Sequence, residues 1–147
     1  MPPLLDSSTR DDFKRRAQTL KADTRGTWGK MTVDQMLHHV NLSLAESLGE
    51  YQAPRSIKGV PQWLVRVAIL YGPWGKGAPT RPDMLVPQGE RFDFAAEHQR
   101  LLDMIDRFCK VPMTGPWPRS ANFPMTGRHW SVLEGRHLDH HLRQFGV

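Results

Sequence analysis

Four stretches of the chain repeat apolar residues at spacings of three and four, which is the pattern of an amphipathic helix. In the first stretch, Ser8 is the expected N-cap, and Phe13, Ala17 and Leu20 recur at helical spacing up to the segment TRGTWG. No stretch alternates polar and apolar residues convincingly enough to indicate a strand. The pattern therefore predicts an all-α protein.

The second helical stretch begins with a capping-box signature, in which Thr32 is followed three residues later by Gln35. Gly49 marks its expected end. Its apolar stripe consists of Val33, Met36, Val40 and Leu44.

The third stretch begins after Asp93, a good capping residue. Its apolar seam alternates spacings of four and three and requires a neighbouring helix to cover it. The seam consists of Phe94, His98, Leu101, Ile105 and Phe108.

The fourth stretch has Thr126 as its expected cap and continues from Arg128 almost to the end of the chain. Its inner face changes from apolar residues to imidazoles. Steps of three and four along that face lead through Trp130, Leu133, His137 and His141.

Residues 51–92, between the second and third helical stretches, are rich in proline and glycine. A connection of this length inside a compact domain is usually functional or disordered. One short helix is expected at residues 61–70, and the aromatic residues Trp63, Tyr71 and Trp74 favour an ordered, packed segment. We expect residues 1–147 to form a single domain, since this length suits one hydrophobic core.

The composition excludes several classes of protein. The single cysteine among 147 residues cannot form an internal disulfide, and the start MPPLLDSSTRDD lacks the order of a secretory signal, so we expect a cytoplasmic location. The longest apolar stretch, VPQWLVRVAILYG, is shorter than the ~20 residues that cross a bilayer. We therefore expect no membrane segment.

The net charge of +5 is concentrated in the connection at residues 51–92, which holds six basic and two acidic residues, a net +4. A local excess of this kind suits a small anion. We do not expect nucleic-acid binding, because the chain shows neither a helix-turn-helix nor a zinc-finger spacing and its basic residues form no helical stripe.

The histidine pattern indicates a metal site. Residues four apart on a helix lie on one face about 5–6 Å apart, so His137 and His141 can direct two imidazoles at one ion. A third ligand is available in QMLHHVN, where His39 lies closer to the apolar stripe than His38 does. Hydrogen-bonded histidines without any ion remain an alternative interpretation of the same spacing.

The segment TWGKMTVDQMLHHV and the later segment HLDHHLRQFG resemble the DinB superfamily of metal-binding proteins. The resemblance implies an up-down-down-up four-helix bundle with a long loop between its second and third helices. It also implies that the metal ligands are His39, His137 and His141, the three residues that the spacing selects, and that the protein can form a homodimer.

Characterised members of that superfamily include transferases and isomerases that depend on low-molecular-weight thiols. The resemblance therefore implies a metal-dependent enzyme of transferase, isomerase or hydrolase type that acts on a small molecule. Zinc is the expected ion and nickel the second choice, since imidazole suits both. A stress-related protein that binds a metal or a ligand without catalysis remains the alternative.

Because the thiols used by those relatives carry carboxylates, a basic loop beside the metal would suit them. Within the connection at residues 51–92, the side chains that we expect to bind such an anion are Arg55, Lys58, Lys76 and Arg81.

Candidates for a catalytic acid or base are His98, His140 and Gln144. The position of His98 on an apolar seam favours a structural bond to a buried partner. Gln144 and Ser43 are placed to bond the free nitrogens of the ligands. Cys109, at the end of its helix, is interpreted as a packed residue.

Overall fold

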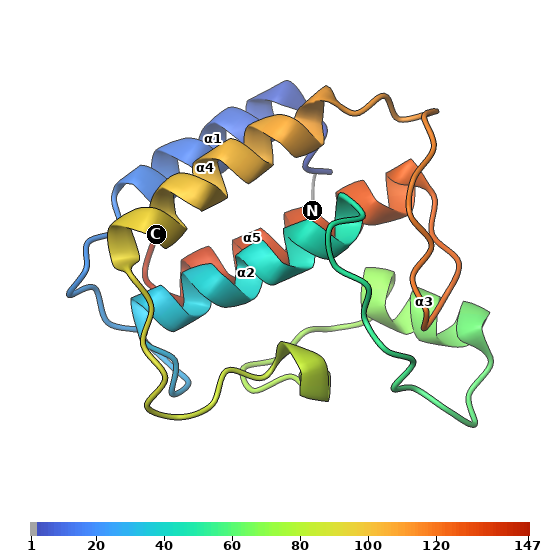
Figure 1. Ribbon diagram of the computed structural model, residues 1–147, viewed down its shortest axis with the longest axis horizontal. Coiled ribbons are helices and arrows are strands. Elements are labelled where there is room, and N and C mark those ends of the chain that lie inside the picture. Colours follow the sequence, from blue (N-terminus) through green and yellow to red (C-terminus); the bar gives the residue numbers. More distant parts are fainter. Residues whose placement is uncertain (1–2) are drawn as a thin grey trace.

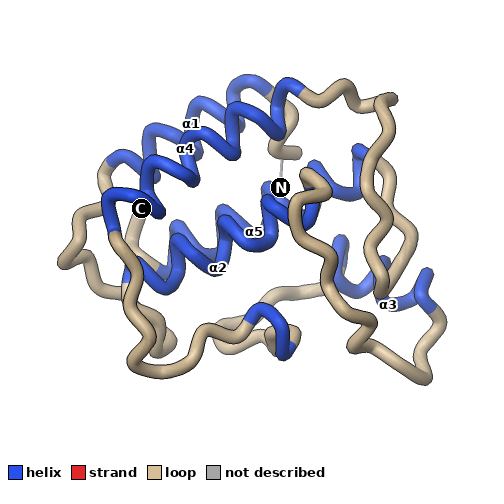
Figure 2. The backbone as a smooth tube through the Cα atoms, in the orientation of Figure 1, coloured by secondary structure: helices blue, strands red, loops and turns tan. Residues whose placement is uncertain are grey.

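The computed structural model describes residues 3–147, and these residues form helices and no strand (Figures 1 and 2). The all-α prediction is confirmed. A short 3₁₀ helix, η1, spans Pro82–Met84. The α-helices are α1 Ser7–Gln18, α2 Val33–Ser47, α3 Gln62–Tyr71, α4 Phe94–Lys110 and α5 Gly127–Gln144.

The four long helices form two layers, with α1 beside α4 in one and α2 beside α5 in the other (Figure 1). Across the layers α4 packs on α2 and α1 packs on α5. Figure 1 shows that α1 and α5 run in one direction and that α2 and α4 run in the opposite one. The short helix α3 packs outside this group, against α5. Within residues 3–147, no helix combines the length and apolar character that crossing a bilayer demands.

Three of the four expected N-caps are confirmed, and one is wrong. The cap of α1 is Asp6, whose Oδ1 accepts bonds from the backbone N–H groups of Ser8 and Thr9 at 3.0 and 3.2 Å. A carboxylate at this position also interacts favourably with the positive end of the helix dipole, which Ser8 cannot do. The confirmed caps are Thr32, Asp93 and Thr126.

The apolar stripes of α1, α2 and α4 face one continuous core. On α5 the expected stripe is wrong at one position, because Leu133 is only partly buried and Glu134 is fully buried. The reason is that α5 contacts α1, α2 and α3 at once, so that its buried arc is wider than one stripe. Core residues that are at most 2 % exposed include Phe13, Met36, Leu44, Leu101, Ile105, Phe108, Trp130 and Leu138.

The connection at residues 51–92 contains α3, one residue from its expected bounds, together with η1. Of the three aromatic residues expected to pack, Trp63 and Tyr71 are 60 % and 65 % exposed, and only Trp74 is partly buried. Because α3 has a single helix beside it, one face remains uncovered. The buried residues of α3 are Val65 and Leu70.

Candidate metal centre

The structure brings together the three histidines that the sequence indicated. His39 comes from α2, and His137 and His141 come from adjacent turns of α5. One ligand nitrogen from each lies within 4.8 Å of the other two. Each pair of imidazole rings has centroids 4.8 Å apart and planes inclined at 75–77°. The three rings therefore surround a common point with nearly three-fold regularity.

Two of these rings are held by hydrogen bonds on the nitrogen that faces away from that point. His39 Nδ1 donates to the backbone carbonyl oxygen of Met84 at 2.9 Å. His141 Nδ1 donates to Oε1 of Gln144 at 2.8 Å. Each bond places the ring's proton on Nδ1 and leaves the lone pair on Nε2 for a ligand.

The spacing of the nitrogens fits an ion of the size of zinc. His39 Nε2 and His137 Nε2 are 2.9 Å apart. Two nitrogens about 2.0–2.1 Å from one ion lie about 3.3 Å apart in tetrahedral geometry and about 2.9 Å apart at a right angle. The same separation also fits one hydrogen bond between a protonated and a bare Nε2. The donor set thus suits either a divalent cation or a histidine link without an ion.

Burial keeps the three imidazoles neutral. Desolvation lowers the pKa of His39 and lowers that of His137 well below its ordinary value, with the neighbouring rings adding to the effect. Desolvation and then the charge of His39 lower the pKa of His141 to about 3. At neutral pH each ring therefore offers a lone pair, which is the form that binds a metal.

Gln144 connects the cluster to the loop before α2. Its Oε1 accepts the bond from His141, and its Nε2 donates to the backbone carbonyl oxygen of Trp28 at 3.0 Å. The next residue, Gly29, has a φ of +78°, and a Cβ there would lie 2.5 Å from Gln144 Nε2. The amide of Gln144 thus packs where only a glycine leaves room. The expectation that Gln144 bonds a free nitrogen of one of the three histidines is met, whereas the same expectation for Ser43 is wrong, because its hydroxyl donates to Glu134.

A cavity of about 910 Å³ extends from the three histidines. Its wall on the α3 side is apolar and includes Leu64, Val65 and Ala68. Ser43 and His140 also line it, the latter with its ring centroid 5.1 Å from that of His141. A volume within the range of small-molecule sites therefore lies directly against the cluster.

Glu134 is a buried acid that the sequence reasoning missed. It lies three residues before His137 and is fully buried. Ser43 Oγ donates to its Oε1 at 2.9 Å, and its Oε2 has no partner among residues 3–147. Desolvation, with a smaller contribution from Glu46, raises the pKa of Glu134 to about 8, so the carboxyl is mostly protonated at neutral pH. The signal in the sequence was the E-x-x-H spacing on a buried helix face.

Arg81, one of the four expected anion-binding residues, already has acidic partners. Its guanidinium bonds both carboxylate oxygens of Glu46, at 3.2 and 2.7 Å, and lies 3.1 Å from Asp83 Oδ2. Tyr51 donates to the same Asp83 oxygen at 3.2 Å. These contacts join the segment around η1 to α2, and Arg81 serves to position that segment beside the histidines.

The other three expected anion-binding residues are exposed, and they lie in different places. Lys76 lies with its Nζ 5.0 Å from the ring centroid of Trp28, in a pocket next to the histidine cluster. Arg55 and Lys58 line neither this pocket nor the larger cavity. The structure therefore places one of the three near the cluster.

His98 and His140, the other two candidates for a catalytic acid or base, lie in different parts of the structure. His98 Nε2 donates to the backbone carbonyl oxygen of Ala17 at 2.8 Å, which links α4 to α1 away from the cavity. His140 lines the cavity.

Cys109 lies 3.3 Å from the carbonyl oxygen of Leu4, and burial raises its pKa to about 11, so the thiol is not ionised at neutral pH.

Family models, curated protein sequences and solved structures yield no match to this chain. The function therefore has to be inferred from the site itself. The resemblance to the DinB superfamily stays a prediction.

Proposed function

We propose that His39, His137 and His141 bind one divalent metal ion, zinc in first place and nickel in second. We further propose that the protein is a metal-dependent enzyme of the thiol S-transferase, isomerase or hydrolase type that acts on a small molecule. The observation that carries this proposal is the position of three buried, neutral imidazoles from two helices against a cavity of about 910 Å³.

The arrangement of the residues supports a catalytic centre more than a purely structural one. Structural zinc sites are closed by four protein ligands, whereas catalytic sites have three and keep one position open. Three ligand side chains are present among residues 3–147, and the cavity adjoins them. An ion held there would act as a Lewis acid toward a substrate in the cavity.

The resemblance to the DinB superfamily supplies the reaction class in this proposal. The directions of α1, α2, α4 and α5 agree with the up-down-down-up order that the resemblance implies (Figure 1). The three histidines also stand at the positions of the implied ligands. A low-molecular-weight thiol as co-substrate and a homodimer belong to the same proposal and rest on the resemblance alone.

A second function is favoured by one specific distance. The 2.9 Å between His39 Nε2 and His137 Nε2 also fits a direct hydrogen bond that joins α2 to α5 without an ion. In that case the cavity would serve to bind a small ligand without metal chemistry. A metal-containing protein that binds a ligand without catalysis lies between these two possibilities.

Metal analysis of the purified protein tests the proposal. We expect about one zinc or nickel ion per chain in the wild type after reconstitution, and none in His39→Ala, His137→Ala or His141→Ala. His38→Ala is the matched control, because this neighbouring histidine points to Glu97 with its Nδ1 3.0 Å from Oε1. The proposal fails if the reconstituted wild type holds no metal and a chelator leaves its melting temperature unchanged.

A further inference from the structure

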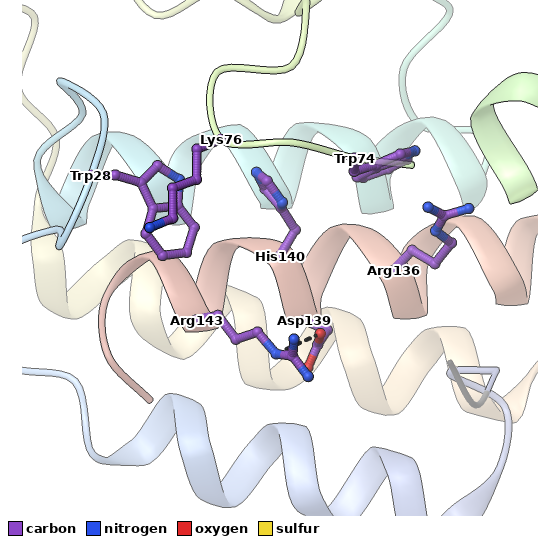
Figure 3. A pocket seen from close by; sticks show the side chains of 7 residues that line it. All are labelled: Trp28, Trp74, Lys76, Arg136, Asp139, His140 and Arg143. Carbon is purple, nitrogen blue, oxygen red and sulfur yellow. Dashed lines mark ion pairs between the residues drawn. The ribbon is translucent and has the colours of Figure 1, made fainter. Parts of the chain in front are cut away.

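A second, smaller pocket of about 300 Å³ adjoins the main cavity (Figure 3). It lies along the outer side of α5, between that helix and the loops that carry Trp28 and Trp74. Three residues line both spaces, namely Trp28, Trp74 and His140. A molecule in the smaller pocket can therefore extend into the larger one, which contains the histidine cluster.

Positive charge exceeds negative charge in this pocket. Three basic residues line it, Lys76, Arg136 and Arg143, against one acid, Asp139. Asp139 is already shared, because its carboxylate is 3.0 Å from Arg143 (Figure 3) and 2.9 Å from Arg16. One carboxylate does not neutralise this many cations, so the pocket attracts an anion.

Arg136 is a cation without a carboxylate partner among residues 3–147. Its guanidinium donates to the backbone carbonyl oxygens of Leu70 and Gly72, and it lies 4.9 Å from the ring centroid of Trp74. Five N–H donors belong to a guanidinium, so donors remain for a ligand after these two bonds. An anion in the pocket would compensate this partly desolvated charge.

The side walls of the pocket are aromatic. The rings of Trp28 and Trp74 lie 6.0 and 5.9 Å from the ring of His140, on either side of it and inclined to it by 70° and 74° (Figure 3). Lys76 lies over Trp28, and Arg136 lies over Trp74. Each indole thus has a cation next to it. This combination suits a ligand with a flat apolar part and a charged group.

We propose that this pocket binds the anionic group, a carboxylate or a phosphate, of a small molecule whose other end extends past His140 to the histidine cluster. Lys76, beside Trp28, and Arg136, beside Trp74, supply positive charge at the two ends of the pocket, Arg143 adds to it beside Asp139, and the indoles of Trp28 and Trp74 contact the flat part of the molecule. The anion subsite stands on its own geometry, whereas the role of the other end rests on the proposed metal function.

Binding of matched aromatic probes tests the anion subsite. Phenylphosphate and phenylacetate carry the two candidate anions, and phenylacetamide is their neutral counterpart. In a protein labelled with ¹⁵N, we expect both anions to shift the indole N–H signals of Trp28 and Trp74 and to leave that of Trp130, in the core, unmoved. Trp28→Phe and Trp74→Phe assign these signals. The tighter of the two anions identifies the preferred group.

The charge dependence is tested with two variants. In Lys76→Ala/Arg143→Ala we expect the dissociation constant of the preferred anion to rise about tenfold or more, with that of phenylacetamide unchanged. Arg55→Ala/Lys58→Ala is the matched control, since it removes two positive charges outside both cavities. Equal affinity for the neutral and the anionic probes, or equal loss in the control, overturns the proposal.

A paramagnetic ion tests the link to the cluster and separates the two proposals. In protein loaded with Co²⁺, we expect the ring protons of the bound anion to broaden, and we expect no broadening in His39→Ala. Anion binding by a protein that takes up no metal would leave the subsite intact and remove the metal function. Metal uptake without any preference for the anionic probes would leave the metal function intact and remove the anion subsite.

Discussion

The Nδ1 of His39 donates to the carbonyl oxygen of Met84 across 45 positions of sequence. Met84 ends η1, and η1 packs on α2, the helix that carries His39. The proline-rich connection is therefore part of the site, because it fixes which nitrogen of His39 carries the proton. Bonds of this kind around a metal ligand typically contribute about 10- to 100-fold in metal affinity.

Removing the side chain that fastens this segment should weaken metal binding from a distance. In Arg81→Ala, Glu46 and Asp83 lose their cation in a largely buried setting, so we expect the free energy of unfolding to fall by about 3 kcal/mol. We also expect about tenfold weaker zinc binding, because the Met84 carbonyl is no longer held against His39. Urea denaturation and competition with a chromophoric chelator measure the two effects.

The matched control for that variant is Arg55→Ala, which removes the same side chain from an exposed position of the same connection. In Arg55→Ala, the free energy of unfolding and the zinc affinity should both match those of the wild type. Zinc affinity that stays at the wild-type value in Arg81→Ala would show that the position of η1 does not affect His39.

Gln144 should be needed for metal affinity although it is not a ligand. In Gln144→Ala, His141 Nδ1 loses its acceptor and the loop at Trp28 loses its donor, so we expect zinc binding to weaken about 10- to 100-fold. Gln144→Glu keeps an acceptor for His141 and should recover most of the affinity. Gln99→Ala, on the exposed side of α4, is the control for the loss of an amide. Equal affinity in the alanine and glutamate variants would contradict this role.

The sequence predicted the parts of the site that depend on local periodicity. His137 and His141 follow from the geometry of one helix, and the choice of His39 over His38 follows from the apolar stripe of another. The structure agrees with both: His38 stacks on Phe92 with ring centroids 3.9 Å apart, while His39 is buried in the cluster. Helix geometry alone supplied this information.

The remaining features depend on contacts between distant segments. The acceptor for His39 comes from an irregular connection that has no period to interpret. Glu134 was missed, because a helix covered by three neighbours buries more than one stripe. The anion pocket combines Trp28, Lys76 and Arg143, which no sequence spacing relates.

The free energy of unfolding of the metal-free protein should fall as the pH drops below about 6.5. His141 has a pKa of about 3 in the folded protein and an ordinary value of 6.5, so between these values the unfolded chain binds more protons than the folded one. Stability is then lost with falling pH, by about 2 kcal/mol from pH 7 to pH 5 for this residue alone. Urea denaturation with a chelator present measures it, and His141→Asn should show a smaller loss. Identical pH profiles would contradict the assigned burial.

At higher pH, the titration of Glu134 should make the free energy of unfolding fall as the pH rises, which is the opposite sign to the effect of His141. Its pKa is about 8 in the folded protein, against an ordinary value of 4.5, so between these values the folded state binds the extra proton and stability falls as the pH rises. From pH 7 to pH 9 we expect the wild type to lose about 1 kcal/mol from this group, in a range where the buried histidines change the stability by less and with the opposite sign. Glu134→Gln keeps an acceptor for Ser43 and cannot ionise, so it should lack this loss over the same range. Urea denaturation at the two pH values measures this loss. If the free energy of unfolding falls as steeply in the variant as in the wild type, Glu134 is already ionised at neutral pH.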